Sequence, residues 1–166
     1  MKLNELVEKG YGNCEVKDGI MNFIVMPKKG KVYSVDELEE GEEIFLTNSF
    51  GKVVGFVYRN DNFIKEWIMQ GNVFYDVESA QEEIKRREVY HKVEKYSYKF
   101  SKGEWKDSDI EKWDVLYNYN SRRIDFVRRG PFQCQRITFK FKEDIQKAIN
   151  EVGEEDFIKY FLGVEL

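Results

Sequence analysis

Short apolar runs separated by polar turn residues follow one another along much of the chain and predict antiparallel strands. From Ile44 onwards, the runs "EIFLT", "KVVGFVY" and "FIKEWIM" are joined by "NSFG" and "RNDN". Three β-rich runs with four-residue connections predict an antiparallel meander. In the second half, "WDVLYNY", "IDFVRRG" and "FQCQRITF" form a comparable series with "NSRR" as the first turn. The pattern therefore predicts two meanders.

Each predicted meander leads through a phenylalanine into a stretch with helical spacing. Phe74 precedes Ile84 by the same interval with which Phe139 precedes Ile149. This parallel predicts a βββα unit used twice, and a chance likeness is the alternative. The second helix departs from the first, because Phe141 stands near the position that Asp76 holds in the earlier unit.

The predicted fold class is α+β, with antiparallel meanders each followed by a helix and a short helix at the N-terminus. The spacing of Leu3, Leu6 and Val7 predicts that first helix, and Gly10 ends it. We expect residues 1–43 to hold this helix and further strands, packed on the rest. We expect residues 44–166 to form the core from two βββα-like units, 44–103 and 113–166.

The helical pattern after residue 76 predicts a long helix that continues through "KRREVYHKVEKYSYKF" and ends at Gly103. Near the C-terminus, Gly153 is predicted to end another helix. A last short helix follows, in which Phe157, Ile158 and Phe161 pack inward.

The stretch "QGNVFYDVESAQEEI" looks like a signature, but structural requirements explain its residues. Gly71 permits a bend or a positive φ angle, and Asp76 is suited to cap a helix N-terminus. Ala80 and Ile84 are then expected to face the core. We interpret the stretch as a joint between a strand and a helix.

Composition indicates a folded protein and limits its class. The chain has 166 residues, 16% of them aromatic, a net charge of −4 and a pI of about 5.3. Direct nucleic-acid binding is not expected at this charge balance, and one compact unit is expected at this length. We found no signal-peptide core and no apolar stretch of membrane-spanning length, so a cytoplasmic location is expected.

Few residues are suited to catalysis. Cys14 and Cys134 lie far apart, and His91 is the single histidine, so neither a zinc site nor a Cys/His pair is indicated. Asp107, Asp109 and Asp114 lack the spacing of a calcium loop. None of the common nucleophile, phosphate-binding or zinc-protease motifs is present. We expect a protein that is not an enzyme and needs no metal or cofactor.

Two charge clusters are the candidate binding surfaces. The acidic run "DELEEGEE" supplies Asp36, Glu37, Glu39, Glu40, Glu42 and Glu43. The basic run "SRRIDFVRRGPFQCQR" supplies Arg122, Arg123, Arg128, Arg129 and Arg136, with Tyr117 and Tyr119 on the preceding strand. Arginine with tyrosine suits a phosphate-bearing ligand and equally a protein interface. A solvated face is the simpler interpretation of either cluster.

Three segments carry a resemblance to a group of proteins: "QGNVFYDVESAQEEIKRREV", "EKWDVLYNYNSRRIDF" and "ITFKFKEDIQKAINEVGEEDFIKYFLGV". With a Gly-Asn-x-Phe before a capped acidic helix, residues 44–166 resemble small uncharacterised accessory proteins of phages and prophages. The resemblance implies an anti-defence context, in which small acidic proteins such as anti-CRISPR proteins occupy host proteins. It supplies no catalytic residue.

These observations lead to two functional hypotheses. The first is a phage-encoded protein that binds and inhibits a host defence protein through the acidic cluster. The alternative is a sponge that sequesters a nucleotide immune signal through the arginines and tyrosines, as a homo-oligomer with pockets between subunits. A nuclease or phosphodiesterase is the third and weakest hypothesis, because its catalytic residues cannot be named.

Overall fold

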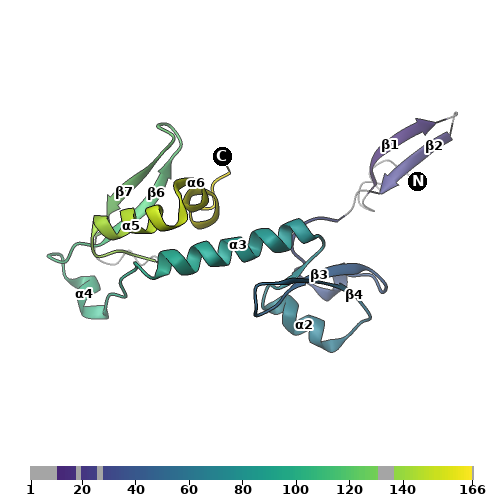
Figure 1. Ribbon diagram of the computed structural model, residues 1–166, viewed down its shortest axis with the longest axis horizontal. Coiled ribbons are helices and arrows are strands. Elements are labelled where there is room, and N and C mark those ends of the chain that lie inside the picture. The colour runs from purple at the N-terminus through teal and green to yellow at the C-terminus, as the bar shows by residue number, and fades with distance from the viewer. Residues whose placement is uncertain (1–10, 18–19, 26–27, 131–136, 166) are drawn as a thin grey trace. The chain divides into compact units, whose positions relative to one another are not determined.

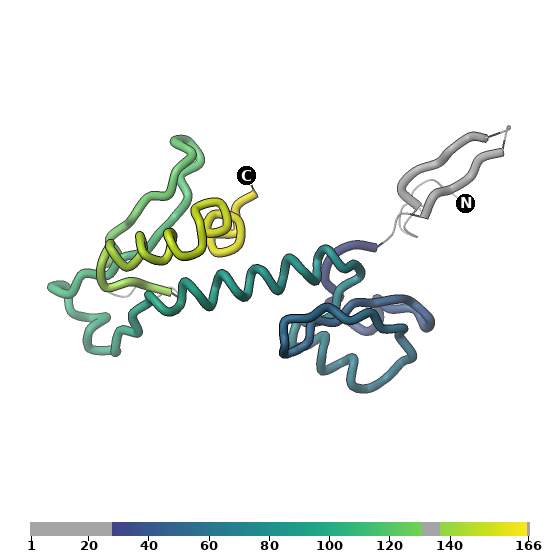
Figure 2. The backbone as a smooth tube through the Cα atoms, in the orientation of Figure 1, coloured from purple at the N-terminus to yellow at the C-terminus, as the bar shows by residue number. Residues whose placement is uncertain are grey.

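The computed structural model describes residues 11–17, 20–25, 28–130 and 137–165. The chain divides into two compact units, Met1–Ile84 (unit 1) and Lys85–Leu166 (unit 2). Helices and antiparallel strands occur in both units (Figure 1). Figure 2 shows the same backbone as a smooth tube. The fold is α+β, as predicted. The boundary falls inside the helix α3 (Val77–Glu94) rather than at a loop.

Unit 1 contains two antiparallel sheets. Its elements in chain order are β1 (Tyr11–Lys17), β2 (Ile20–Val25), the 3₁₀ helix η1 (Val35–Glu37), β3 (Glu43–Thr47), β4 (Val53–Val57), α2 (Asn62–Met69), β5 (Val73–Phe74) and the start of α3. Strands β1 and β2 pair with each other, and the second sheet has the order β4-β3-β5. Strand β3 is therefore central: it pairs antiparallel with β4 on one side and with β5 on the other.

The core of unit 1 lies on one face of this three-stranded sheet. Ile44 and Leu46 are buried on β3, and their two-residue spacing places them on the same face. Ile64 and Ile68 are buried on α2, four residues apart and hence on one side of that helix. Val32, Leu38, Tyr58 and Val73 complete the buried cluster. Part of the predicted N-terminal portion, residues 1–43, thus contributes to this core.

The run "FIKEWIM" forms helix α2, so the prediction of a third strand there was wrong. Its apolar residues Phe63, Ile64, Trp67 and Ile68 repeat at intervals that a helix brings to one face. The first series therefore has two strands and a helix where three strands were expected. The βββα duplication and the short N-terminal helix are not confirmed, and residues 1–10 lie outside the described ranges.

The predicted strand-to-helix joint is confirmed at Gly71, Asp76 and Ala80, whereas Ile84, also expected to face the core, is only half-buried and belongs to neither buried cluster. Asp76 caps α3, because its Oδ1 accepts a hydrogen bond from Ser79 N at 2.7 Å. Its Oδ2 accepts from Gly30 N at 2.8 Å, which ties the helix start to the segment before η1. Gly71 has a φ of +72°, and a side chain there would collide with Lys31. Ala80 is fully buried.

Unit 2 combines a hairpin with short helices. Its elements are the rest of α3, then α4 (Lys102–Lys106), β6 (Trp113–Asn118), β7 (Arg123–Arg128), α5 (Lys142–Val152), α6 (Glu154–Asp156) and the π-helix η2 (Phe157–Phe161). The buried cluster draws on α3, β6, α5, η2 and the segment before α5: Val89, Val93, Val115, Ile137, Phe139, Ile145, Ala148, Ile149 and Phe157. Ile124 and Phe126, two residues apart on β7 and hence on one face, pack against it.

Helix α3 ends at Glu94, so the prediction that it continues to Gly103 was wrong. After the helix, Tyr98 N donates to Thr138 O at 2.8 Å, so the backbone here is hydrogen-bonded to a distant segment instead of continuing the helix. Ser101 then starts α4 with a capping box to Glu104, and Gly103 lies inside that helix. Gly153, with a φ of +88°, does end α5, as predicted.

Candidate functional site

The acidic segment, residues 36–43, runs from η1 to the first residue of β3 and is held by its own backbone. Ser34 caps η1, since its Oγ accepts a hydrogen bond from Asp36 N at 3.2 Å. Leu38 is buried, and Gly41 N donates to Tyr58 O at 2.9 Å beyond the end of β4. These contacts fix the segment to the sheet, so its carboxylates extend from an ordered backbone.

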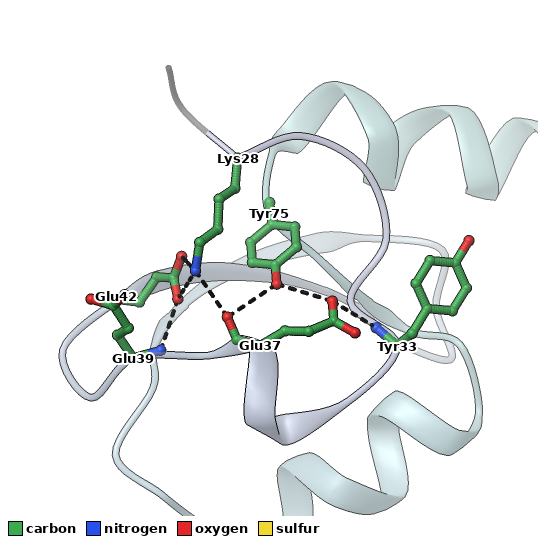
Figure 3. Close-up of polar contacts among 6 residues, drawn as sticks. All are labelled: Lys28, Tyr33, Glu37, Glu39, Glu42 and Tyr75. Atoms are coloured by element: carbon green, nitrogen blue, oxygen red, sulfur yellow. Dashed lines mark hydrogen bonds and ion pairs between the residues drawn. The ribbon is translucent and has the colours of Figure 1, made fainter. Parts of the chain in front are cut away.

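Two of the six candidate carboxylates are engaged within the unit (Figure 3). Lys28 Nζ lies 3.1 Å from Glu42 Oε1 and donates to Glu37 O at 2.9 Å. Glu42 Oε2 also accepts from Glu39 N at 3.0 Å, so Glu42 stabilises the turn from within. A structural role accounts for both Glu42 and Lys28.

Glu37 interacts with the residue before the α3 cap. The Tyr75 hydroxyl lies 3.2 Å from Glu37 Oε2 and 3.3 Å from the Glu37 carbonyl oxygen, and the ring lies 5.2 Å from Lys28 Nζ. Partial burial, and then the negative charge of Glu37 and its hydrogen bond, raise the pKa of Tyr75. Tyr75 therefore stays a neutral donor and joins the acidic segment to the joint that caps α3.

Glu37 is exposed as well but has these partners, whereas the other four carboxylates are exposed and have no ion-pair partner among the described residues. Asp36, Glu39, Glu40 and Glu43 are exposed, and Asp36 accepts a hydrogen bond from Ser34 Oγ at 3.2 Å. Within the described part of the chain, the side chains of Glu39, Glu40 and Glu43 form no ion pair. This leaves a compact group of negative charges on a fixed backbone, which is an arrangement suited to meeting a basic surface.

Carboxylates neutralise most of the described arginines in the β6–β7 region. Arg123 Nε lies 2.9 Å from Asp125 Oδ1, and Arg128 Nη1 lies 3.5 Å from Glu111 Oε1. The hydrogen bond from Asn118 and then the contact with Arg123 outweigh desolvation and lower the pKa of Asp125. Arg136 lies outside the described residues.

Arg129 is part of the fold rather than of a binding surface. Its Nη2 and Nε lie 2.6 Å and 2.8 Å from Asp114 Oδ2, and the side chain of Asp114 is 4% exposed. The other Asp114 oxygen accepts from the Val115 backbone N–H at 2.7 Å. A buried ion pair with its hydrogen bonds satisfied leaves no charge for a ligand.

Arg122 and Tyr117 line an open hollow of about 670 Å³ in unit 2. The same hollow is lined by Glu154, Glu155 and Asp156. Tyr119 is 70% exposed and forms an edge-to-face pair with Tyr117, with their ring centroids 5.2 Å apart. The three carboxylates oppose an anionic ligand at this position, and Arg122 alone offers little to offset them.

The remaining chemistry-bearing residues do not assemble into a site. His91 is exposed on α3. Asp114 forms its ion pair with Arg129, so it does not act together with Asp107 and Asp109. Across the described residues, no group of three or more His, Cys, Asp or Glu side chains is placed to hold a metal ion.

Sequence reasoning missed one unusual residue, Lys112, which is 1% exposed. Its Nζ donates to Asp107 O at 2.7 Å and to Ile110 O at 2.9 Å, and it lies 5.7 Å from the Phe100 ring centroid. Carbonyl oxygens and aromatic faces thus surround the ammonium. Nothing in "DIEKWD" distinguishes this lysine from its solvated neighbours, so no local signal could have found it.

Comparisons of the chain with protein families, curated proteins and solved structures gave no match. None of the helices in the described ranges has the length and hydropathy needed to cross a membrane. The arrangement of charges in the structure is therefore the basis for a functional proposal.

Proposed function

We propose that this protein is a phage-encoded accessory protein that binds a host defence protein and inhibits it, with the acidic segment as the interface. The proposal rests on one observation: within residues 36–43, some carboxylates have partners inside the protein and others do not. Glu37 and Glu42 hold the segment in place, while Asp36, Glu39, Glu40 and Glu43 face solvent. The phage origin and the cytoplasm of an infected host as the site of action come from the resemblance in sequence.

The proposed mechanism is occupation of a basic groove. Carboxylates grouped on one surface attract a complementary positive surface and raise the rate of encounter, with a strong dependence on salt. Because the backbone of the segment is already ordered, docking costs less conformational entropy than ordering a loose loop would. A nucleic-acid substrate of the host protein is then excluded because its phosphates need the same positive groups.

The sponge for a nucleotide signal is the second candidate, and the arrangement of charges supports it less. Arg123, Arg128 and Arg129 each have a carboxylate within 4 Å, and carboxylates line the hollow that contains Arg122. One observation favours it, which is the edge-to-face pair of Tyr117 and Tyr119, because Tyr117 lines that hollow.

Charge reversal with a matched control tests the proposal. The first variant carries Asp36→Lys, Glu39→Lys and Glu40→Lys in unit 1. The control carries Asp109→Lys, Glu154→Lys and Glu155→Lys in unit 2, all at exposed positions, so the change in net charge is the same. Tagged wild-type protein should capture a host protein from lysate and inhibit its purified activity, the first variant should do neither, and the control should do both.

The same preparation distinguishes the two candidates. Ligands released from the purified protein by heating are identified, and the test is repeated with Arg122→Ala. A nucleotide released by the wild type and lost in Arg122→Ala, with no captured protein, would support the sponge and remove the inhibitor proposal. A captured protein that binds both charge-reversed variants equally well would also overturn the role of the acidic segment.

A further inference from the structure

Strand β4 has a free edge that lacks the usual protection. In the order β4-β3-β5, one side of β4 pairs with β3, and no strand in the described part of the chain pairs with the other side. Val53–Val57 reads "VVGFV", without a charged residue or a proline. Exposed edge strands of stable monomers generally carry lysine, proline or a bulge to prevent pairing with another chain.

The backbone groups that point outward from this edge follow from the pairing with β3. Asn48 N donates to Lys52 O at 2.9 Å, and Tyr58 N donates to Glu42 O at 2.9 Å. Hydrogen-bonded and non-hydrogen-bonded pairs alternate along an antiparallel ladder. Lys52, Val54, Phe56 and Tyr58 therefore direct their backbone groups toward β3. Val53, Gly55 and Val57 direct theirs toward the free edge.

Apolar side chains flank the edge on both faces of the sheet. Val54 is 48% exposed and Val57 is 46% exposed, and their odd spacing places them on opposite faces. Phe63, 42% exposed, packs edge-to-face on Phe56, with ring centroids 5.4 Å apart. Single exposed apolar residues are ordinary, but here they border a row of unpaired backbone donors and acceptors.

We propose that β4 pairs antiparallel with β4 of a second copy of this chain, about a twofold axis at Gly55. This register places the three outward-facing residues opposite one another, Gly55 against Gly55 and Val53 against Val57. The two three-stranded sheets then join into one continuous sheet. The same residues of both copies form the interface, as in an isologous dimer. A register centred on Val54 or Phe56 would also fit the alternation of the ladder, but it would place two residues of Val53–Val57 opposite residues outside the strand.

The sequence around the edge suits self-pairing. In the proposed register Lys52 lies opposite Tyr58 and Arg59 lies opposite Gly51, so no two cations face each other. The two copies of Lys52 are about 20 Å apart, from six residues at about 3.3 Å each. Gly55 has no side chain at the axis, which lets the two backbones approach. The β4 strand is thus compatible with its own copy in both charge and shape.

Crosslinking tests the register. In a Cys14→Ser, Cys134→Ser background, Gly55→Cys is treated with a short bifunctional maleimide, and Lys52→Cys serves as the matched control. A Cβ at residue 55 meets only ordinary contacts, with Phe45 and Glu43 at 3.6 Å, so this variant should fold. The Gly55→Cys protein should yield a covalent dimer at protein concentrations where Lys52→Cys yields at least tenfold less. Equal yields would overturn the proposed register.

Mass measurement over a range of concentrations tests the dimer itself. Val57→Lys places a charge at the edge, opposite Val53 of the other copy, and Met69→Lys is the control at another exposed apolar residue, on α2. The wild type and Met69→Lys should dimerise as concentration rises, and Val57→Lys should stay monomeric. At low concentrations, where all three are monomers, their urea midpoints should agree. A wild type that stays monomeric at the highest concentration, or binds an extended strand of another protein instead, would refute self-pairing.

This inference does not depend on the proposed function. Reversing Asp36, Glu39 and Glu40 should leave the dimer intact, whereas Val57→Lys should still inhibit a host protein if each copy binds by itself. Failure of one proposal is therefore visible separately from failure of the other.

Discussion

The acidic segment and the β6–β7 hairpin are both charge clusters in the sequence, yet the structure uses their charges differently. In the hairpin, Arg123, Arg128 and Arg129 all have carboxylate partners from the hairpin or the residues just before it. In the acidic segment, Glu37 and Glu42 have internal partners, and Asp36, Glu39, Glu40 and Glu43 face solvent. Linear charge density alone does not show which charges remain available to a partner.

The largest loss of stability is expected when the most deeply buried of these ion pairs is broken. Asp114→Ala leaves the Arg129 guanidinium without its carboxylate, and the Arg129 side chain is only 23% exposed. Removing one partner of a buried pair typically costs 3–5 kcal/mol, and because Arg129 reaches some water we expect about 3 kcal/mol. Urea denaturation measures the change in the free energy of unfolding.

Asp125→Ala is the matched control for that prediction. Asp125 pairs with Arg123 on the same hairpin, but the Arg123 side chain is 69% exposed. The midpoint should therefore remain close to that of the wild type, since exposed pairs contribute little. If the two variants lost stability equally, the distinction between buried and exposed pairs in this hairpin would be incorrect.

Substitutions of Lys112 distinguish what its charge contributes to stability from what its packing contributes. Lys112→Ala removes a buried four-carbon stem and should lower the free energy of unfolding by about 2 kcal/mol. Lys112→Met restores the volume without the ammonium, and we expect it to recover most of the loss because a buried charge is itself costly to desolvate. Lys106→Ala, at an exposed position of α4, is the control and should change nothing. A Met variant as unstable as the Ala variant would show that the ammonium, with its two carbonyl acceptors, dominates.

Asp76 is expected to give a smaller and pH-dependent effect. Burial raises the pKa of Asp76, but the hydrogen bonds from Gly30 and Ser79 outweigh it and hold the pKa below its ordinary value of 3.8. The charged carboxylate therefore stabilises the fold above that pH, and its contribution is lost as the pH falls through the folded-state pKa. Asp76→Ala should cost about 1 kcal/mol at pH 7, in the usual range for a helix cap.

Asp76→Asn isolates the charge, because asparagine still caps a helix but does not titrate. Its stability should vary less between pH 5 and pH 2 than that of the wild type, measured as urea midpoints at each pH. An Asn variant with the same acid dependence as the wild type would place the titrating group elsewhere.

The smallest expected effect concerns the exposed carboxylates of the acidic segment. Asp36→Lys, Glu39→Lys and Glu40→Lys together should change the free energy of unfolding by no more than about 0.5 kcal/mol, as exposed substitutions usually do. Thermal and urea unfolding provide the measurement. A large loss of stability would mean that these side chains support the fold, and the contrast with Glu37 and Glu42 would no longer hold.

Features that depend on neighbouring residues could be predicted from the sequence. The Asp76 cap, the bend at Gly71 and the end of α5 at Gly153 each arise within a few residues of the amino acid that causes them. The inward faces of Ile124 and Phe126 also follow from strand alternation alone. Helix α2 was mistaken for a strand because a short apolar run fits both periods. What decides between them is the burial of Ile64 and Ile68 in one cluster with residues of β3, and that packing is not local.

Long-range pairing explains the other errors. Helix α3 stops at Glu94 because the backbone after it bonds to a distant segment: Tyr98 N donates to the carbonyl of Thr138, forty residues further along the chain. The pair Asp114–Arg129 could have been found, since the β6–β7 register places Asp114 opposite Val127 and hence diagonal to Arg129. The availability of individual carboxylates in residues 36–43 could not, because it depends on Lys28 and Tyr75.

The burial of Lys112 gives the chain an internal reporter of its own opening. Acylating reagents modify lysine amines only when these reach solvent as free bases, and the ammonium of Lys112 is enclosed between two carbonyl oxygens and aromatic rings. Modification at this lysine should proceed only as fast as unit 2 exposes it, while exposed lysines react at once. The rate of acylation at one residue, read by mass spectrometry, would then time the opening of unit 2 without any added probe.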